Sequence, residues 1–593
     1  MNILLYAIFV PIAASLLCFI FRGIAKWVAL LISAVTLAMA GMIFFGGEAT
    51  SAFLSLRAYV LSSGVFVAAA LFTLLIVLYS FKFMEGKERL GEYYGYILMT
   101  IGATAGAVFA NEYVVLLVFW GILGITLYML IGLGGPEASG AAKKTFIIVG
   151  GSDALMIIGI GLVWMITGNP QIGFKPLPLN HIFTILAFLA LSAGAFAKAG
   201  AIPLHSWIPD SAEVAPAPVM AFLPAALDKL LGIYLLTRIC VDIFRLEPNS
   251  AMSIFLLIIG SVTIIAAVMG ALVQHNLKKL LSFHAVSQVG YMVLGIGTGI
   301  PVGIAGGLFH MLNHSIYKSC LFLTGASVEH ETGTTELGQL GGLAKFMPLT
   351  FVSALVAALS ISGVPPFNGF VSKWMVYQGV IELGKTSPYW MIWLIAAMFG
   401  SALTLASFMK ILHATFLGQW SDVTSKAKEV HWTMWLPMVT LAALCIIFGV
   451  FAFALPLTFF ILPAVKGVVY TGFWKPGLAT LLIILGLVVG LVIYWLGKVK
   501  NAVPKPAYVG GELLDEKEVK VSGINFYNTI KDWGPLRGIY ALSERRFFDV
   551  YEIGSKITFG LSGVLKWLHS GLLHTYLAWM FLGVLVLLWA LIR

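Results

Sequence analysis

The chain has 593 residues, of which 60% are hydrophobic and 10% are charged, and its mean hydropathy is +0.97. Soluble domains carry about 25% charged residues, so this composition excludes a soluble globular enzyme. The net charge of +10 does not indicate a nucleic-acid surface, because the Lys and Arg residues lie in short loops between apolar segments rather than in one stripe.

Apolar segments of the length that crosses a bilayer recur along the whole chain. A transmembrane helix needs about 20 largely apolar residues. By this criterion of length, the sequence predicts an all-α polytopic membrane protein of about sixteen spans. The chain is apolar from its second residue, and no convincing cleavage site follows, so we expect a retained first span rather than a signal peptide. The expected spans are residues 2–21, 27–46, 58–81, 93–110, 113–134, 146–168, 182–201, 218–241, 251–274, 279–299, 302–327, 347–380 with a break, 388–418, 433–462, 473–497 and 572–592.

The segment 274–331 combines two apolar spans with an unusual set of polar side chains. His310, His314 and Lys318 follow one another at intervals of four residues, and Asn313 and Tyr317 directly precede two of them. On a helix, residues at this spacing share one face. Ionisable groups are costly in hydrocarbon and usually mark an ion path or a bundle interior. We interpret the stripe as a candidate proton path, against the alternative of a polar cluster that only holds helices together. Its members are His310, Asn313, His314, Tyr317 and Lys318.

Two other spans are interrupted in a similar way, by proline close to a lysine. In the first, Lys198 lies just before Pro203. Proline breaks the helical ladder, and broken backbone is tolerated in a membrane only where protein or water satisfies it. Paired broken helices are typical of transporters built from inverted repeats, while the alternative for each lysine is a side chain that snorkels to the interface. The second interruption and its lysine are formed by Pro365, Pro366, Gly369 and Lys373.

The two interruptions suggest how the chain is organised. Each repeat is expected to hold five spans, an odd number that forces opposite orientation in the membrane. A mixed apolar and charged composition in 498–570 favours an amphipathic, lateral segment at the interface. The expected parts are three N-terminal spans in 1–92, a first inverted repeat in 93–241, a second in 251–418, two further spans in 433–497, the amphipathic segment in 498–570 and an anchoring span in 571–593.

Further ionisable residues lie inside the first repeat. Asp153 lies about two turns into the sixth span, and Asp228 and Lys229 lie in the eighth. Adjacent residues are about 100° apart on a helix, so Asp228 and Lys229 are expected to have separate partners. A structural ion pair is the alternative for both.

The loops between spans carry the information on orientation. Lys and Arg accumulate on the cytoplasmic side of membrane proteins, which places the N-terminus outside. The isolated cysteines have no CxxC spacing, so neither an iron–sulfur cluster nor a disulfide framework is indicated. His310 and His314 are spaced like a metal-binding pair, but zinc needs three or four ligands, so we predict no metal site and no cofactor. The basic loops expected on one side contain Arg22 and Lys26; Lys82, Lys87 and Arg89; Lys143 and Lys144; Lys278 and Lys279; and Lys426 and Lys428.

Four long blocks resemble one known family. They read AKAGAIPLHSWIPDSAEVAPAPVMAFL, KKLLSFHAVSQVGYMVLGIG, FHMLNHSIYKSCLFLTGAS and GVPPFNGFVSKW. They resemble the antiporter-like subunits of respiratory complex I and the Mrp cation/proton antiporters. Within that superfamily, LPAALDKLLGIYLL and the later GGE followed by VSGINFYNTIKDW are most similar to the large membrane subunit of energy-converting (group 4) [NiFe] hydrogenases.

The resemblance implies a fold of fourteen core helices in two inverted five-helix repeats, with a lateral helix and a last anchoring span. It also implies roles for individual residues. Lys198 and Lys373 match the lysines of the two broken helices, and Asp153 matches an aspartate of the preceding span. The family usually has a glutamate where Gly121 stands, and some members have a histidine where Pro224 stands. The central histidines and lysine correspond to His310, His314 and Lys318.

The function implied is that of a non-redox subunit that translocates protons, or exchanges Na⁺ for H⁺, in a membrane-bound energy-converting hydrogenase or related complex-I-like assembly. Redox chemistry would then take place in peripheral [NiFe] and iron–sulfur partner subunits, and this chain would have no catalytic redox centre of its own. The alternatives are a subunit of an Mrp-type Na⁺/H⁺ antiporter or of NADH:quinone oxidoreductase. A membrane enzyme that itself binds haem or quinone is a third alternative. In each case the chain is expected in the cell membrane.

Overall fold

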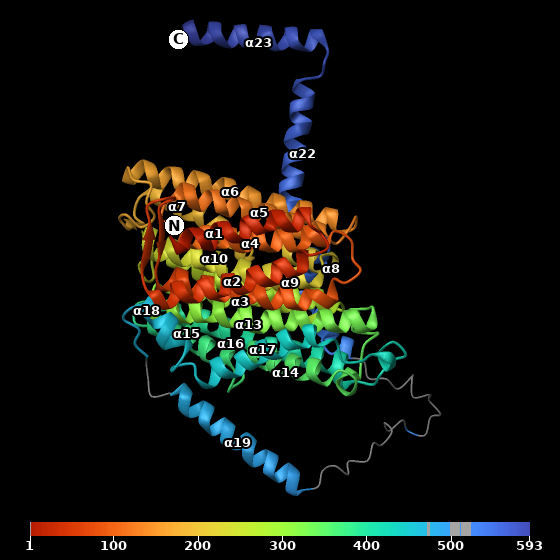
Figure 1. Ribbon diagram of the computed structural model, residues 1–593. Helices are drawn as coiled ribbons and strands as arrows, with labels where there is room; N and C mark the ends of the chain where they lie inside the picture. Colours follow the sequence, from red (N-terminus) through yellow and green to blue (C-terminus); the bar gives the residue numbers. More distant parts are fainter. Residues whose placement is uncertain (1, 471–474, 498–509, 511–522, 593) are drawn as a thin grey trace. The chain divides into compact units, whose positions relative to one another are not determined.

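The computed structural model describes residues 2–470, 475–497, 510 and 523–592. Contacts divide the chain into two compact units, residues 1–529 and 530–593. Within the first unit, most helices run side by side, parallel or antiparallel to one another (Figure 1). Two short strand pairs connect loops: β1 (Ala49–Ser51) is antiparallel to β2 (Leu56–Ala58), and β3 (Leu177–Pro178) is parallel to β4 (Phe244–Arg245).

The helices follow the apolar segments closely. The helices before the second strand pair closes are α1 (Ile3–Ile20), α2 (Ala25–Gly46), α3 (Val60–Phe83), α4 (Leu90–Phe109), α5 (Tyr113–Gly132), α6 (Ala138–Thr167), α7 (Ile182–Ala199), α8 (Trp207–Val214), α9 (Ala217–Phe222), η1 (Leu223–Leu227), α10 (Asp228–Arg238) and η2 (Ile239–Ile243). Those that follow are α11 (Ala251–Leu272), α12 (Leu277–Gly297), α13 (Pro301–Thr332), η3 (Leu343–Lys345), α14 (Pro348–Ser362), α15 (Asn368–Leu383), α16 (Trp390–Leu412), η4 (His413–Leu417), η5 (Thr424–Lys426), α17 (Trp432–Val450), η6 (Leu457–Ile461), α18 (Leu462–Ala464), α19 (Pro476–Leu496), η8 (Gly523–Asn525), α20 (Asn528–Asp532), α21 (Gly534–Glu544), α22 (Val550–Leu568) and α23 (Leu573–Ile592).

The all-α polytopic prediction is confirmed. Within the described residues, 13 helical segments are long and apolar enough to cross a membrane. The remaining expected spans correspond to α4, to α13 and to the interrupted pair α14 and α15. The sequence of α13 explains why it is not among the 13, because its 32 residues include the polar stripe.

Two spans are interrupted at the proline segments. The first ends with Gly200 in the left-handed region (φ +81°) after α7, and the second with Gly363 (φ +80°) after α14. A left-handed residue at this position closes a helix, and glycine adopts it without a Cβ clash. Each connection then contains a cis X-Pro bond, Ile202–Pro203 and Pro365–Pro366, before α8 and α15 begin.

The span expected at 218–241 is not a uniform helix. It consists of α9, the π-helical turn η1, α10 and the π-helical turn η2. Pro224 lies in η1 and has no backbone N–H, so the normal bond to the carbonyl four residues earlier is lost. The wider turn accommodates this loss. Because η1 ends directly before Asp228, it changes the direction in which Asp228 and Lys229 project.

Burial separates the central helices from the peripheral ones. In the most apolar 18-residue stretch of each segment, all residues are buried in Ala217–Ile243 and 94% in Leu277–Gly297, but only 28% in Ala25–Gly46 and in Trp390–Leu417. The segments that carry Asp228, Lys229 and His284 therefore lie in the interior, and outer helices keep apolar side chains on the outside.

The C-terminal segment can be described only in part. Residues 498–509 and 511–522 of the predicted amphipathic segment, including the last two residues of GGE, lie outside the described residues. The described remainder forms η8, α20, α21 and α22 rather than one helix. In the second unit, Lys531 Nζ lies 2.6 Å from Glu544 Oε1 and ties the start of the unit to the end of α21.

Candidate functional site

Three helices of the first half bring together a tryptophan, an aspartate and a lysine. Trp120 on α5 donates its indole N–H to Asp153 Oδ1 on α6 at 3.0 Å. The Nζ atom of Lys198, in the last turn of α7, lies 5.3 Å from the centroid of the Trp120 ring, within cation–π range. Trp120 therefore links the two charged groups that the sequence singled out.

Asp228 is the second carboxylate of this region. Lys198 interacts electrostatically first with Asp228 and then with Asp153, and Asp228 in turn interacts with Lys198 and with Lys229. Lys198 and Lys229 are 0% exposed and Asp228 is 1% exposed. Asp228 therefore interacts with two fully buried lysines. We expected separate partners for Asp228 and Lys229, but these two residues also interact with each other.

Lys229 lies against the first helix interruption. A Cβ atom placed on Gly200 would be 3.2 Å from Lys229 Nζ. The glycine that ends α7 thus leaves room for the lysine of α10. The broken backbone and the charged side chain form one structural unit, as expected where a membrane helix is interrupted.

His314 connects this region to the central helix α13. Its charged neighbours are Lys229, Lys318 and His310, and it also approaches the backbone of Ala225. Its ring centroid is 5.5 Å from that of Tyr317. His314 therefore stands between the lysine of α10 and the lysine of α13.

Lys318 is enclosed by aromatic rings. Its Nζ atom is 5.6 Å from the Phe322 ring centroid and 5.7 Å from the Phe408 ring centroid, and the side chain is 0% exposed. Within the described part of the chain, no hydrogen-bond partner is found for the Nζ atoms of Lys198, Lys229, Lys318 and Lys373. These four ammonium groups are held by ring faces and by charge rather than by fixed hydrogen bonds.

His310 is the most connected member of the stripe. Its Nδ1 lies 2.9 Å from Ser372 Oγ on α15, and its Nε2 lies 3.2 Å from Gln288 Oε1 on α12. The Tyr317 hydroxyl is also 3.2 Å from Nε2. Either ring nitrogen of histidine can donate or accept, depending on the tautomer, so His310 can pass a proton between α12 and α15.

Lys373 lies at the second interruption. Its Nζ atom is 4.6 Å from the Tyr291 ring centroid, and a Cβ atom on Gly363 would lie 3.9 Å from that Nζ. Lys373 thus occupies the same relation to Gly363 that Lys229 has to Gly200. The hydroxyl of Tyr291 donates to the carbonyl of Ala397 at 2.8 Å and lies 2.9 Å from Ser401 Oγ.

The buried ionisable side chains form a file in which neighbouring groups influence one another electrostatically. The proton affinity of a buried group depends strongly on the charges beside it, so moving one proton alters the affinity of the next group. The stripe joins two regions that lie on opposite sides of α13. The file contains Asp153, Lys198, Asp228, Lys229, His314, Lys318, His310 and Lys373.

Sequence reasoning missed several neutral members of this site. Trp120, Tyr291 and Ser372 each contact an ionisable group directly. His284 is also fully buried, and its Nε2 is 2.7 Å from Ser407 Oγ. A fully apolar span with a single Trp or Ser gives no periodic signal, so only the three-dimensional packing identifies these residues.

Lys410 has a different role from the other buried lysines. Its Nζ atom donates to the carbonyl oxygens of Leu272 and Gln274, each at 2.8 Å. Both carbonyls are at the C-terminal end of α11, where helix carbonyls lack intrahelical partners. This geometry indicates a structural role for Lys410.

Charged pairs identify one end of the bundle, which we call the basic end. Lys144 Nζ lies 2.8 Å from Asp210, and Lys279 Nζ lies 3.2 Å from Glu213 on the same helix, α8. Lys278 Nζ lies 2.8 Å from Glu329 near the end of α13. Loops that we expected on one side of the membrane therefore meet at one end.

The same fold and family occur in known proteins. Residues 110–404 match the family described as NADH:quinone oxidoreductase/Mrp antiporter, TM. A chain in the structure of the membrane-bound sulfane sulfur reductase (MBS), an archaeal respiratory membrane complex, is covered over 100% of both lengths with a TM-score of 0.83 and 25% identity. This chain belongs to the antiporter-like subunits of the complex I and Mrp superfamily.

Other relatives of this antiporter-like chain differ in length. The Na(+)/H(+) antiporter subunit A1 of Staphylococcus epidermidis is 31% identical over 403 residues, which cover 64% of this chain and 50% of the relative. The chain therefore spans about half the length of the curated relatives it matches. Chains of the Mrp complex from Dietzia sp. (TM-score 0.71, 22% identity) and of respiratory complex I from Thermus thermophilus (0.68, 20%) have the same fold over 78% of this chain.

At Gly121, where the resemblance led us to expect a glutamate, a Cβ atom would meet nothing within 4 Å. The carboxylates that interact with Lys198 are instead those of Asp228 and Asp153. Pro224, the other position where the resemblance led us to expect a different residue, lies within the π-helical turn that precedes Asp228.

Proposed function

We propose that this chain is the non-redox, proton-translocating subunit of a membrane-bound energy-converting hydrogenase or a related complex-I-like assembly. The observation that supports it is the file of buried Asp, Lys and His side chains that extends from Asp153 to Lys373. Ionisable groups in a membrane interior are costly and mark ion paths. Helix packing alone does not require eight ionisable side chains in the membrane interior.

The chemistry of the file favours H⁺ over Na⁺ as the ion that moves along it. Lysine and histidine bind and release protons, whereas their positive charges repel a metal cation. Four buried lysines lie along the file, and the two carboxylates are at one end of it. We therefore propose that Na⁺, if it is exchanged, does not follow this file.

A mechanism follows from the shared position of Asp228. When the carboxylate lies nearer Lys198, it stabilises the ammonium of that residue more than that of Lys229, and the reverse holds when it moves. A change of about 1.4 kcal/mol alters proton affinity tenfold, so a small displacement is sufficient. Lys229 would then exchange a proton with Lys318 through His314, and His310 would relay between His314 and Lys373.

Three assemblies are compatible with this role. The full-length similarity to a chain of the sulfane sulfur reductase complex supports a redox-driven assembly with membrane partners and peripheral iron–sulfur or [NiFe] subunits. The names of the curated relatives favour the alternative, an Mrp-type Na⁺/H⁺ antiporter. A subunit of NADH:quinone oxidoreductase is a further alternative. Affinity purification under mild detergent distinguishes them: redox subunits that co-purify support the first, and an assembly without metal favours the second.

The transport role is tested with Lys318→Met in the intact assembly, in sealed membrane vesicles. Because Met keeps the apolar stem and removes the ammonium, we expect proton translocation to fall at least about tenfold while the amount of assembled complex is unchanged. Lys345→Met, at an exposed position over the Trp420 ring, is the control and should translocate normally. Normal translocation by Lys318→Met would refute the proposal.

A further inference from the structure

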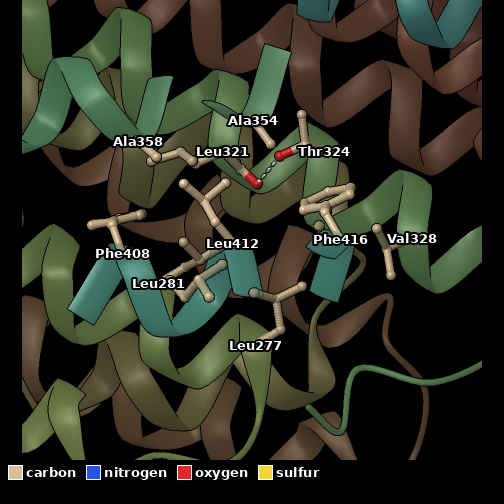
Figure 2. A pocket seen from close by; sticks show the side chains of 12 residues that line it. Leu277, Leu281, Leu321, Thr324, Val328, Ala354, Ala358, Phe408, Leu412 and Phe416 are labelled. Carbon is tan, nitrogen blue, oxygen red and sulfur yellow. Dashed lines mark hydrogen bonds between the residues drawn. The ribbon is translucent and has the colours of Figure 1, made fainter. Parts of the chain in front are cut away.

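An apolar cavity lies between α12, α13, α14 and α16 (Figure 2). Its lining on α13 begins at Leu321, three residues after Lys318 in the direction of the basic end. Leucine side chains from α12, α13 and α16 point into it, and the Phe408 ring closes one side (Figure 2). The lining residues used below are Leu277, Leu281, Leu321, Thr324, Val328 and Phe408.

The cavity continues the helix faces that carry the proton file. On α13, Leu321 follows Lys318 by three residues and Val328 follows Leu321 by seven, which keeps Leu321 and Val328 on one face, beside Lys318. On α12, Leu281 lies three residues before His284 and therefore on the His284 face. The file and the cavity thus form one line along these helices, polar at the middle and apolar toward the basic end.

Phe408 belongs to both parts. Its ring lines the cavity, its centroid is 5.7 Å from Lys318 Nζ, and it is 4.8 Å from the His284 ring centroid. The Phe408 ring therefore lies between Lys318 and the other residues that line the cavity on α16. Four residues separate Phe408 from the π-helical turn η4, a type of local widening that is frequent at functional sites.

The cavity offers water very few partners. The hydroxyl of Thr324 donates to the carbonyl of Leu321 at 2.8 Å, as the dashed line in Figure 2 shows, and the other lining side chains are apolar. A buried water needs two to four polar partners, so a cavity of this chemistry stays dry. Beyond it, Lys278 and Glu329 form the ion pair of the basic end, about 16 Å along α13 from Lys318 at 1.5 Å per residue.

We propose that this cavity is a hydrophobic gate, closed by dewetting, between Lys318 and the basic end of the bundle. Hydrophobic constrictions of this kind stop ions and protons without a plug, and they open when water enters. Phe408 is the side chain that must move for a water file to reach Lys318. The gate rests on the proposed function, because it gives the central lysine a controlled connection to one side of the membrane.

The test places polar groups in the cavity and measures passive proton leak. The purified assembly is reconstituted in liposomes without any redox substrate, a K⁺ diffusion potential is applied, and an internal pH dye is followed. Leu321→Asn supplies water with partners beside Lys318, and we expect the leak to rise about tenfold over wild type. Val328→Thr keeps the side-chain shape and adds one hydroxyl, so its leak should be intermediate even if the asparagine variant fails to fold.

Leu98→Asn is the matched control, a fully buried leucine on α4 that does not line the cavity. It should destabilise the bundle as Leu321→Asn does, yet leave the leak at the wild-type level. Wild-type leak in both cavity variants, with the proteins folded, would overturn the gate. Failure of the wild-type assembly to translocate protons under turnover would instead refute the proposed function, and the leak measurement does not depend on turnover.

Discussion

Replacing Asp228 by Asn is the most informative change in the proton file. The substitution keeps the shape of the side chain and removes its charge. Asp228 is the carboxylate that interacts with Lys229, and it is the first of two that interact with Lys198. After the change, Lys198 retains Asp153, and Lys229 loses the charge that compensates it.

The size of the effect follows from burial. Lys198 and Lys229 are 0% exposed, and Asp228 acts on them electrostatically without a hydrogen bond to either Nζ atom in the described part of the chain. Because loss of a buried ion pair in contact costs about 3–5 kcal/mol, we expect a smaller cost here, about 1–3 kcal/mol, which is equivalent to about one to two powers of ten in an equilibrium constant. The exposed pair of Lys279 and Glu213 provides the contrast, because surface pairs contribute about 0–1 kcal/mol.

Two measurements are needed on each variant: thermal stability of the solubilised assembly, and proton translocation per assembled complex in sealed vesicles. We expect Asp228→Asn to lower both, with translocation reduced at least about tenfold. Glu213→Gln should change neither. Adding Lys229→Met to Asp228→Asn removes the uncompensated charge, so stability should recover while translocation stays low.

Two results would refute this reasoning. Wild-type translocation by Asp228→Asn would mean that the carboxylate does not control the lysines beside it. A double variant that is less stable than Asp228→Asn alone would mean that Lys229 is not the group left uncompensated.

Three further changes test separate parts of the structure. Trp120→Phe keeps a ring beside the lysine and removes the hydrogen bond to Asp153; we expect a loss of about 1–3 kcal/mol in stability and a smaller loss of translocation than in Asp228→Asn, measured on the same vesicles. Lys410→Met removes two charge-assisted hydrogen bonds, so thermal stability should fall by the equivalent of about 2–4 kcal/mol with unchanged translocation per assembled complex. Gly290→Ala places a Cβ 2.5 Å from a backbone oxygen of α11 and should destabilise the assembly by about 1–3 kcal/mol. Gly121→Ala, with open space around its Cβ, is the control and should be tolerated. Equal melting temperatures for the two variants would contradict this packing.

The spans were predictable because bilayer thickness sets their length and composition. The interruptions after Lys198 and before Lys373 were predictable for a different reason, since proline has a local effect that does not depend on the rest of the fold. The polar stripe of α13 was also predictable, because a regular helix converts sequence spacing directly into a shared face.

The partners across helices were not predictable from the sequence. Which carboxylate meets Lys198 depends on the rotation of α10, and the π-helical turn η1 changes that rotation. Trp120 gives no signal of its own in an apolar span, although its indole reaches Asp153. Lys410 has the same residue type and burial as Lys318, and only the two carbonyls that it contacts reveal its structural role.

The helix α13 is continuous over its 32 residues, Pro301–Thr332, between two interrupted spans. His310, His314 and Lys318 are therefore fixed to one rod and separated by constant intervals, about 6 Å per four residues. No movement of this rod changes the distances between their backbones. If the chain translocates protons as we propose, changes in the distances between the ionisable groups would come from the interrupted spans that carry Lys229 and Lys373, while the spacing along α13 stays constant.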